Sequence, residues 1–145
     1  MKKRFLMILV ALCVFAGSAF ATNWFEAYTK GYIDLDSLKF DGPYVFAWVK
    51  QLNDGDWKPQ NGQKIHYKMI YYVADCESRK VDIIAGATYN LNKTVVDSFD
   101  ISSNYNPYSK YNDWRAVVPD SIMEVNYNML CYCRNLYINK QNSSN

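Results

Sequence analysis

Alternating apolar and polar positions mark most of this chain as β-strand. Segments 42–52, 64–76, 79–90 and 93–101 are rich in aromatic and β-branched residues, and a short apolar segment at 23–28 precedes them. Gly, Asn, Asp and Pro crowd the loop at 53–62, whereas the joints between the later strands are short and polar. Because a parallel crossover needs a dozen or more residues, short joints predict an antiparallel meander of about six strands.

The strand over 65–76 shows how its side chains are divided between two faces. A period of two places Ile65, Tyr67, Met69, Tyr71 and Val73 on one face, and His66, Lys68, Ile70, Tyr72, Ala74 and Cys76 on the other. Both faces become apolar toward Cys76, so protein covers both, or tyrosines line an uncovered one. Half-buried strand tyrosine is the commonest use of the 13 Tyr, and an exposed aromatic binding face is the alternative.

The segment 101–118 breaks the strand pattern. It combines Ser, Asn, Pro and Asp at turn density with four aromatic residues, Tyr105, Tyr108, Tyr111 and Trp114. Polar loops with interleaved rings suit recognition surfaces, because rigid rings supply contact area at low entropic cost. A loop that folds its own rings against the sheet is the alternative, and the pattern favours it slightly.

The last element is a predicted helix that begins at Pro119. Proline in the first turn and a capping box formed by Ser121 and Glu124 mark its start. Helical periodicity places Ile122, Val125, Met129, Cys133 and Leu136 on one side, and Met123, Tyr127, Leu130 and Cys131 on another. Cys131 and Cys133 lie roughly 200° apart, so we expect that they do not both face the sheet. The polar tail over 139–145 is expected to be disordered. Together these elements predict an α+β domain.

Residues 1–21 have the pattern of a cleaved secretory signal peptide. Lys2, Lys3 and Arg4 precede an uncharged apolar run that ends at Ala19-Phe20-Ala21, the small-residue pattern of a cleavage site. Leu12 stands before Cys13 where a lipoprotein signal requires a small residue, so we expect no lipid anchor. The prediction is export to the periplasm, the cell surface or the medium, with residues 22–145 as a single domain.

Loss of the signal peptide changes the charge balance. The chain has 16 Lys and Arg against 14 Asp and Glu, and removal of Lys2, Lys3 and Arg4 leaves 13 against 14. A formal charge near −1 gives no basic footprint for nucleic acid. The mature chain has no second apolar run long enough to span a bilayer.

The residues that could carry catalysis or bind metal do not form a recognisable site. The single histidine, His66, is interpreted as an exposed strand residue rather than a base, metal ligand or haem ligand. The spacing of the cysteines matches no zinc pattern, phosphate-binding glycine loops are absent and the carboxylates are scattered. We therefore predict a protein that is not an enzyme and needs no cofactor or metal.

Several motifs resemble the bacterial surface-adhesin protein E family. They are "GYIDLDSLKFDG", "YVFAWVKQL", "YKMIYYVADCESRKVDIIAGATYN", "KTVVDSFD" and, above all, "VPDSIMEVNYNMLC". The resemblance covers most of 24–131 and implies an antiparallel sheet whose concave face holds a C-terminal helix through one disulfide. Carried onto this sequence, that bridge joins Cys76 to Cys131.

Export allows disulfides to persist, and three cysteines remain in the mature chain, so one thiol is left over. Under the pairing that the resemblance implies, this is Cys133. We expect it to be a free or weakly protected thiol that could link two chains in a homodimer.

Two functions follow from the resemblance. The first is a surface adhesin that binds host extracellular proteins of the vitronectin or laminin type, through tyrosines and lysines on the sheet or the 101–118 loop. The second is a periplasmic or secreted module, structural or binding a small ligand, which the missing lipid anchor and the near-neutral charge favour. Lys50, Lys64 and Lys68, around the 53–62 loop, are the best basic candidates, and solvated strand-edge charge is their alternative interpretation.

Overall fold

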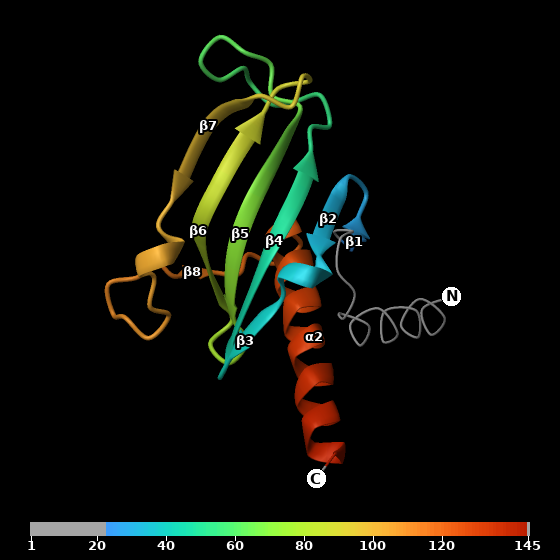
Figure 1. Cartoon of the computed structure of the whole chain (residues 1–145), viewed down its shortest axis with the longest axis vertical. Coiled ribbons are helices and arrows are strands. Elements are labelled where there is room, and N and C mark those ends of the chain that lie inside the picture. Colours follow the sequence, from blue (N-terminus) through green and yellow to red (C-terminus); the bar gives the residue numbers. More distant parts are fainter. Residues whose placement is uncertain (1–22, 145) are drawn as a thin grey trace.

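The computed structural model describes residues 23–144, and its main feature is an antiparallel sheet (Figure 1). Six strands follow one another across it in chain order, β1-β2-β4-β5-β6-β7. They span Trp24–Tyr28, Gly31–Asp34, Tyr44–Leu52, Tyr67–Asp75, Lys80–Tyr89 and Val95–Asp100. The predicted meander of α+β class is therefore confirmed, while the predicted signal peptide over 1–21 lies outside the described residues.

Short elements complete the sheet at its margins. Strand β3, Lys39–Asp41, pairs with β4, and β8, Arg115–Ala116, pairs with β6. Two 3₁₀ helices cover Leu35–Ser37 and Ser102–Asn104. The sequence pattern did not predict these elements, because two or three residues are too few to display a period.

Strand β4 shows which face of the sheet carries the core. Its odd-numbered residues Val45, Ala47 and Val49 are at most 1% exposed, whereas the residues between them are only partly buried. They pair with Ala74, Tyr72 and Ile70 of β5, which therefore point to the same side. These side chains meet the C-terminal helix and form the core of the domain.

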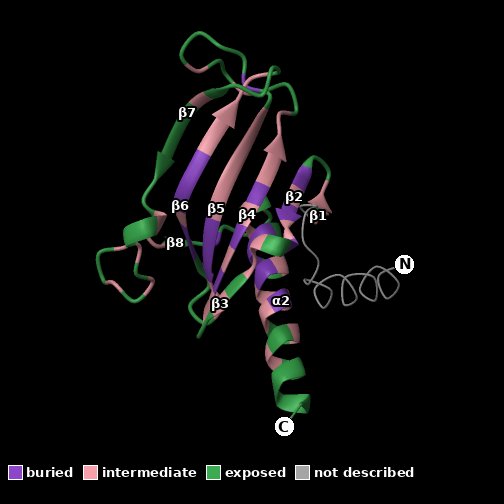
Figure 2. Cartoon of the chain, viewed as in Figure 1, coloured by how far each residue is buried: buried purple, intermediate pink, exposed green. Residues whose placement is uncertain are grey.

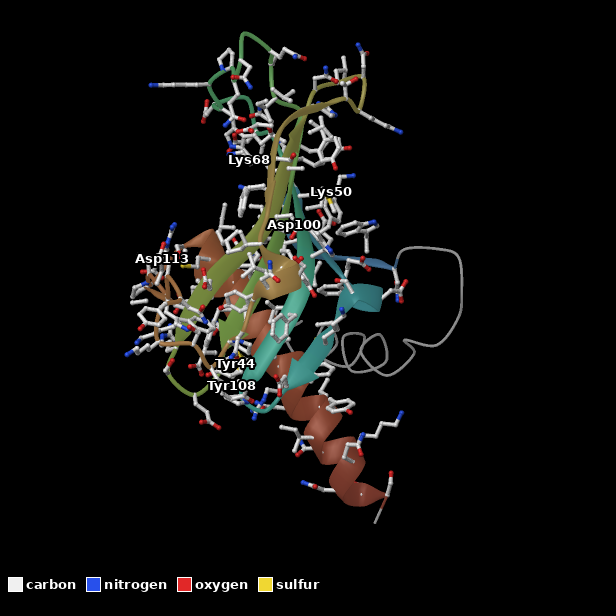
Figure 3. All side chains as sticks on the ribbon, turned by 60° about the vertical axis from the view of Figure 1, so that its left-hand side comes forward. Tyr44, Lys50, Lys68, Asp100, Tyr108 and Asp113 are labelled. Atoms are coloured by element: carbon white, nitrogen blue, oxygen red, sulfur yellow. A yellow bond between two sulfur atoms is a disulfide. The ribbon has the colours of Figure 1, made fainter. Side chains whose placement is uncertain are left out.

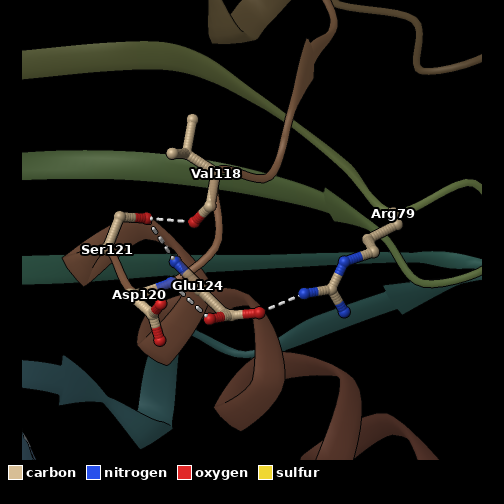
Figure 4. A network of polar contacts seen from close by, with 5 residues as sticks. All are labelled: Arg79, Val118, Asp120, Ser121 and Glu124. Carbon is tan, nitrogen blue, oxygen red and sulfur yellow. Dashed lines mark hydrogen bonds and ion pairs between the residues drawn. The ribbon is translucent and has the colours of Figure 1, made fainter.

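The C-terminal helix α2 spans Ile122–Ser143 and begins with the predicted capping box (Figure 4). The N–H of Glu124 donates to Oγ of Ser121 at 3.2 Å, and Glu124 Oε2 accepts from the N–H of Asp120 at 2.9 Å. The other Glu124 oxygen pairs with Arg79, from the β5–β6 turn. The predicted start at Pro119 was wrong, because Asp120 adopts a left-handed φ of 57° and holds the chain in a turn until Ser121.

The facing predicted for this helix was right for one side, because Tyr127 and Leu130 lie in the core and Cys131 packs against it, but wrong for Cys133, which was assigned to the other side and is also buried. The buried residues of α2 are Asn126, Tyr127, Leu130 and Cys133, whereas Ile122 and Val125 are 45% and 37% exposed. Leu130 is the centre of the buried stripe and is 0% exposed. Cys131 and Cys133 lie on its two sides, so both belong to the surface of the helix that meets the protein.

One disulfide joins the helix to the sheet. Cys76 and Cys131 are bonded, with their Cα atoms 5.5 Å apart, as the family resemblance implied. Cys133 is 2% exposed and lies outside this bridge. Its sulfur would have to leave the core before it could bond a second chain.

The last turns of α2 extend beyond the sheet (Figures 1 and 2). The polar tail was expected to be disordered, but residues 139–143 continue the helix and are exposed. The segment lacks Gly and Pro, so no strong helix breaker interrupts the pattern after Leu136.

Candidate functional site

The face of the sheet opposite α2 carries a concentration of aromatic side chains. We call it the open face and define it by Tyr44, Phe46, Trp48 and Lys50 of β4 and their neighbours Tyr67, Met69, Tyr71 and Val73 on β5. The Trp48 and Tyr71 rings stack with centroids 4.9 Å apart, and those of Tyr67 and Tyr89 stack at 4.5 Å. Except for Val73, these side chains are only partly buried, so the open face meets solvent.

One end of the open face is covered by the loop over 101–114. The ring of Trp114 stacks on Tyr44, and Tyr108 meets Tyr44 edge to face at 5.0 Å, near each other in Figure 3. The Tyr105 hydroxyl donates to Oδ2 of the buried Asp82 at 2.9 Å. Tyr105 and Trp114 thus fold against the sheet, Tyr108 touches Tyr44 but is 61% exposed, and Tyr111, 85% exposed, extends into solvent.

The bond between Tyr105 and Asp82 anchors this loop. Burial and the neighbouring carboxylate both raise the pKa of the Tyr105 hydroxyl, so it keeps its proton and its role as donor. Oδ1 of Asp82 accepts from the N–H of Ile83, so the tyrosine satisfies the second oxygen.

Tyr105→Phe is expected to lower the free energy of unfolding by about 1 to 3 kcal/mol, because it leaves a buried carboxylate oxygen without its donor. Tyr108→Phe is the matched control, since Tyr108 is 61% exposed and donates to the exposed Asp41. It should change stability by less than about 0.5 kcal/mol. Urea denaturation of the two variants measures the difference, and equal effects would contradict an anchoring role for Tyr105.

The uncovered part of the open face contains a hollow of about 660 Å³. We call it the open-face hollow. The side chains of Ala85, Ala87 and Ser98 are small and leave space on β6 and β7, and larger lining side chains surround that space. The described residues that line it are Trp24, Asp34, Trp48, Met69, Ala85, Gly86, Ala87, Tyr89, Val95, Ser98, Phe99 and Asp100. They include two carboxylates and no basic side chain.

The strand register places these carboxylates at opposite ends of a single row across the sheet. Trp48 pairs with Tyr71, Tyr71 with Ala85, and Ala85 with Asp100. On the other side Ile33 pairs with Val49, which places Asp34 beside Trp48. The aromatic pair thus lies between a carboxylate on β2 and a carboxylate on β7.

Each carboxylate is held through one oxygen. Asp34 Oδ1 accepts from the N–H of Asp36 at 3.0 Å, and Asp100 Oδ1 accepts from the N–H and Oγ of Ser102. Partial burial raises the pKa of Asp34, while the Ser102 hydrogen bonds lower that of Asp100. Within residues 23–144 no hydrogen bond reaches Oδ2 of either side chain, so both second oxygens are available to a ligand.

The three lysine candidates do not form one group. Lys50 lies on the open face with its Nζ 4.8 Å from the Tyr67 ring centre. Lys68 (labelled in Figure 3) pairs with Gln51 and so points to the opposite face, where its Nζ lies 4.2 Å from the centre of the Trp57 ring. Lys64 is exposed before β5. Only Lys50 therefore stands beside the open-face hollow.

Sequence reasoning missed Trp24, Asp34, Trp48 and Asp100 as members of one site. For Trp48 the alternation within β4 was a usable signal. Its neighbours Ala47 and Val49 are core residues, so Trp48 between them must point to the opposite face. No sequence signal links Asp34 to Asp100, since their positions depend on the register of five strands.

The described residues hold no group of three or more His, Cys, Asp or Glu that could bind a metal ion. His66 is exposed directly before β5, as predicted.

Comparison with known proteins gives the family of this fold. The family described as "Surface-adhesin protein E" matches residues 24–132, most of the chain. The chain belongs to the surface-adhesin protein E family. The matched segment contains the sheet and the disulfide, and it ends within α2.

Solved structures of this family share the fold at low sequence identity. Crystal form II of Haemophilus influenzae protein E is 12% identical, with a TM-score of 0.52, over 82% of this chain and 94% of that one. Protein E from non-typeable Haemophilus influenzae is also 12% identical, with a TM-score of 0.49, over 82% of each chain. At such identity only the fold carries over, and the second match supports no further argument.

No curated protein matches the chain significantly. Among residues 23–144, no helix has the length and apolar character needed to cross a membrane.

Proposed function

We propose that this protein is an exported cell-envelope adhesin that binds host extracellular proteins of the vitronectin or laminin type through its open face. Membership of a surface-adhesin family supports display outside the cell. The observation that carries the proposed binding role is the open-face hollow, which is lined by aromatic rings and bounded by two carboxylates. The proposal assigns the partner to this face and not to the face that α2 occupies.

The composition of the open face supports this choice. Trp and Tyr are enriched among the few residues that dominate the energy of protein interfaces, and large contiguous apolar patches on a protein surface mark contact sites. Trp48 and Tyr71 are already stacked on each other, so little side-chain entropy remains to be lost on binding. The loop over 101–114, which packs on Tyr44 of this face, also carries the exposed Tyr111.

Protease treatment of intact cells of the bacterium that produces this protein tests whether the domain is displayed on the cell surface. Digestion of this protein while a known periplasmic control survives is the expected result. Protection of both proteins would contradict surface display and favour the alternative, a periplasmic module. Partner binding is then measured with purified protein on immobilised vitronectin and laminin, with albumin as the negative control.

A further inference from the structure

We propose that the open-face hollow takes an extended basic peptide segment, which runs across the strands with an Arg or Lys on each of Asp34 and Asp100. This proposal rests on the proposed function and names the chemistry of the partner segment. It concerns residues that the sequence analysis did not single out.

The spacing of the two carboxylates fits such a segment. Four strand-to-strand steps separate β2 from β7 in the order β2-β4-β5-β6-β7. Adjacent strands lie about 4.8 Å apart, so Asp34 and Asp100 are about 19 Å apart. An extended peptide rises about 3.3 Å per residue, and its residues i and i+6 span nearly the same distance.

The charge of the hollow selects a cation. Its lining contains Asp34 and Asp100 without a basic side chain, and each has an oxygen that no described residue occupies. Glu26 pairs with Tyr32, which pairs with Lys50, so the next row on this side holds one further carboxylate and one cation. A guanidinium or ammonium group would pair with these oxygens through charge-assisted hydrogen bonds.

The groups between the carboxylates suit the rest of the segment. The rings of Trp48 and Tyr71 can contact the side chains of the peptide between its two ends. Cationic side chains suit them because ring faces attract cations. Ala85, Ala87 and Ser98 are small and let a peptide backbone approach β6 and β7. A neutral saccharide would also stack on the rings, but it would leave both carboxylate charges without a counter-ion.

Two peptides of identical composition test the spacing. Both contain Gly and Ser with two arginines; in the first about five residues separate the arginines, and in the second the arginines are adjacent. Binding is followed by calorimetry and tryptophan fluorescence at physiological salt. A peptide with glutamates for arginines and a neutral chitooligosaccharide complete the series. The spaced arginine peptide should bind best, and the glutamate peptide should not bind.

Asp34→Asn and Asp100→Asn test the residues, because asparagine retains the oxygen that accepts the local hydrogen bonds. Each should weaken binding of the spaced peptide by about tenfold, the order expected for loss of a hydrogen bond to a charged group. Asp56→Asn removes a carboxylate from the exposed 53–62 loop and should leave binding unchanged. Circular dichroism checks that all three variants remain folded.

Three results would overturn the proposal: equal binding of the two arginine peptides, unchanged binding by both hollow variants, or binding of the saccharide without the peptide. The failures of the two proposals can be told apart. Protein that binds vitronectin or laminin but no arginine peptide would refute only the basic segment. Binding of the spaced peptide without either host protein would refute only the choice of partner.

Discussion

Replacing both Cys76 and Cys131 with alanine is expected to lower the free energy of unfolding by about 4 kcal/mol. The bridge closes a loop with a sequence separation of 55 residues, and its loss would release that restraint in the unfolded chain. It also joins the end of β5 to the middle of α2, so the helix would be held on the sheet by packing alone. Chemical denaturation of the oxidised protein and the double variant measures the change.

The third cysteine provides the control for this prediction. Cys133→Ala removes a buried sulfur from the same helix without opening the disulfide. This variant should lower the free energy of unfolding by about 1 kcal/mol, as expected for truncation of a small buried side chain. An equal loss in the two variants would show that the cysteines act through packing and not through loop closure.

Leu130→Ala is expected to destabilise the protein by about 3 kcal/mol, within the usual range for a fully buried leucine. Leu130 is 0% exposed and packs in the core with Val45, Ala47 and Tyr72 of the central strands. Truncation removes apolar contact and leaves a cavity between helix and sheet, where the backbone has little freedom to collapse. Thermal and urea unfolding measure the loss.

Val125→Ala is the matched truncation on the same helix. Val125 is 37% exposed, and alanine has the higher helix propensity, so stability should change by less than about 0.5 kcal/mol. A large effect at Val125 with a small one at Leu130 would contradict the observed packing of α2 on the sheet.

Much of the sheet could be predicted because its strands are long and regular. The alternation over 65–76 correctly separated Tyr67, Met69 and Tyr71 from Ile70, Tyr72 and Ala74. A strand has only two faces, so one buried residue fixes the direction of every other. The Cys76–Cys131 pairing followed from the family resemblance and not from the pattern itself.

The helix face could not be predicted in the same way. The buried stripe of α2 includes the polar Asn126, while the apolar Ile122 and Val125 are 45% and 37% exposed. Apolar and polar residues are therefore poorly segregated around this helix, and periodicity gives no reliable direction. The open-face hollow depends on the register of five strands, a tertiary property that local patterns do not contain.

The most direct test of a binding role for the open face uses two neighbouring positions on β7. Ser98 lies in the open-face hollow, and Asp97 points to the other side of the sheet; both are exposed. Ser98→Arg would fill the hollow with a long cationic side chain, whereas Asp97→Arg changes the charge more but leaves the hollow intact. On immobilised vitronectin and laminin, we expect Ser98→Arg to weaken binding by about tenfold or more and Asp97→Arg to bind like the unchanged protein. Equal binding by both variants would contradict a role for the open face.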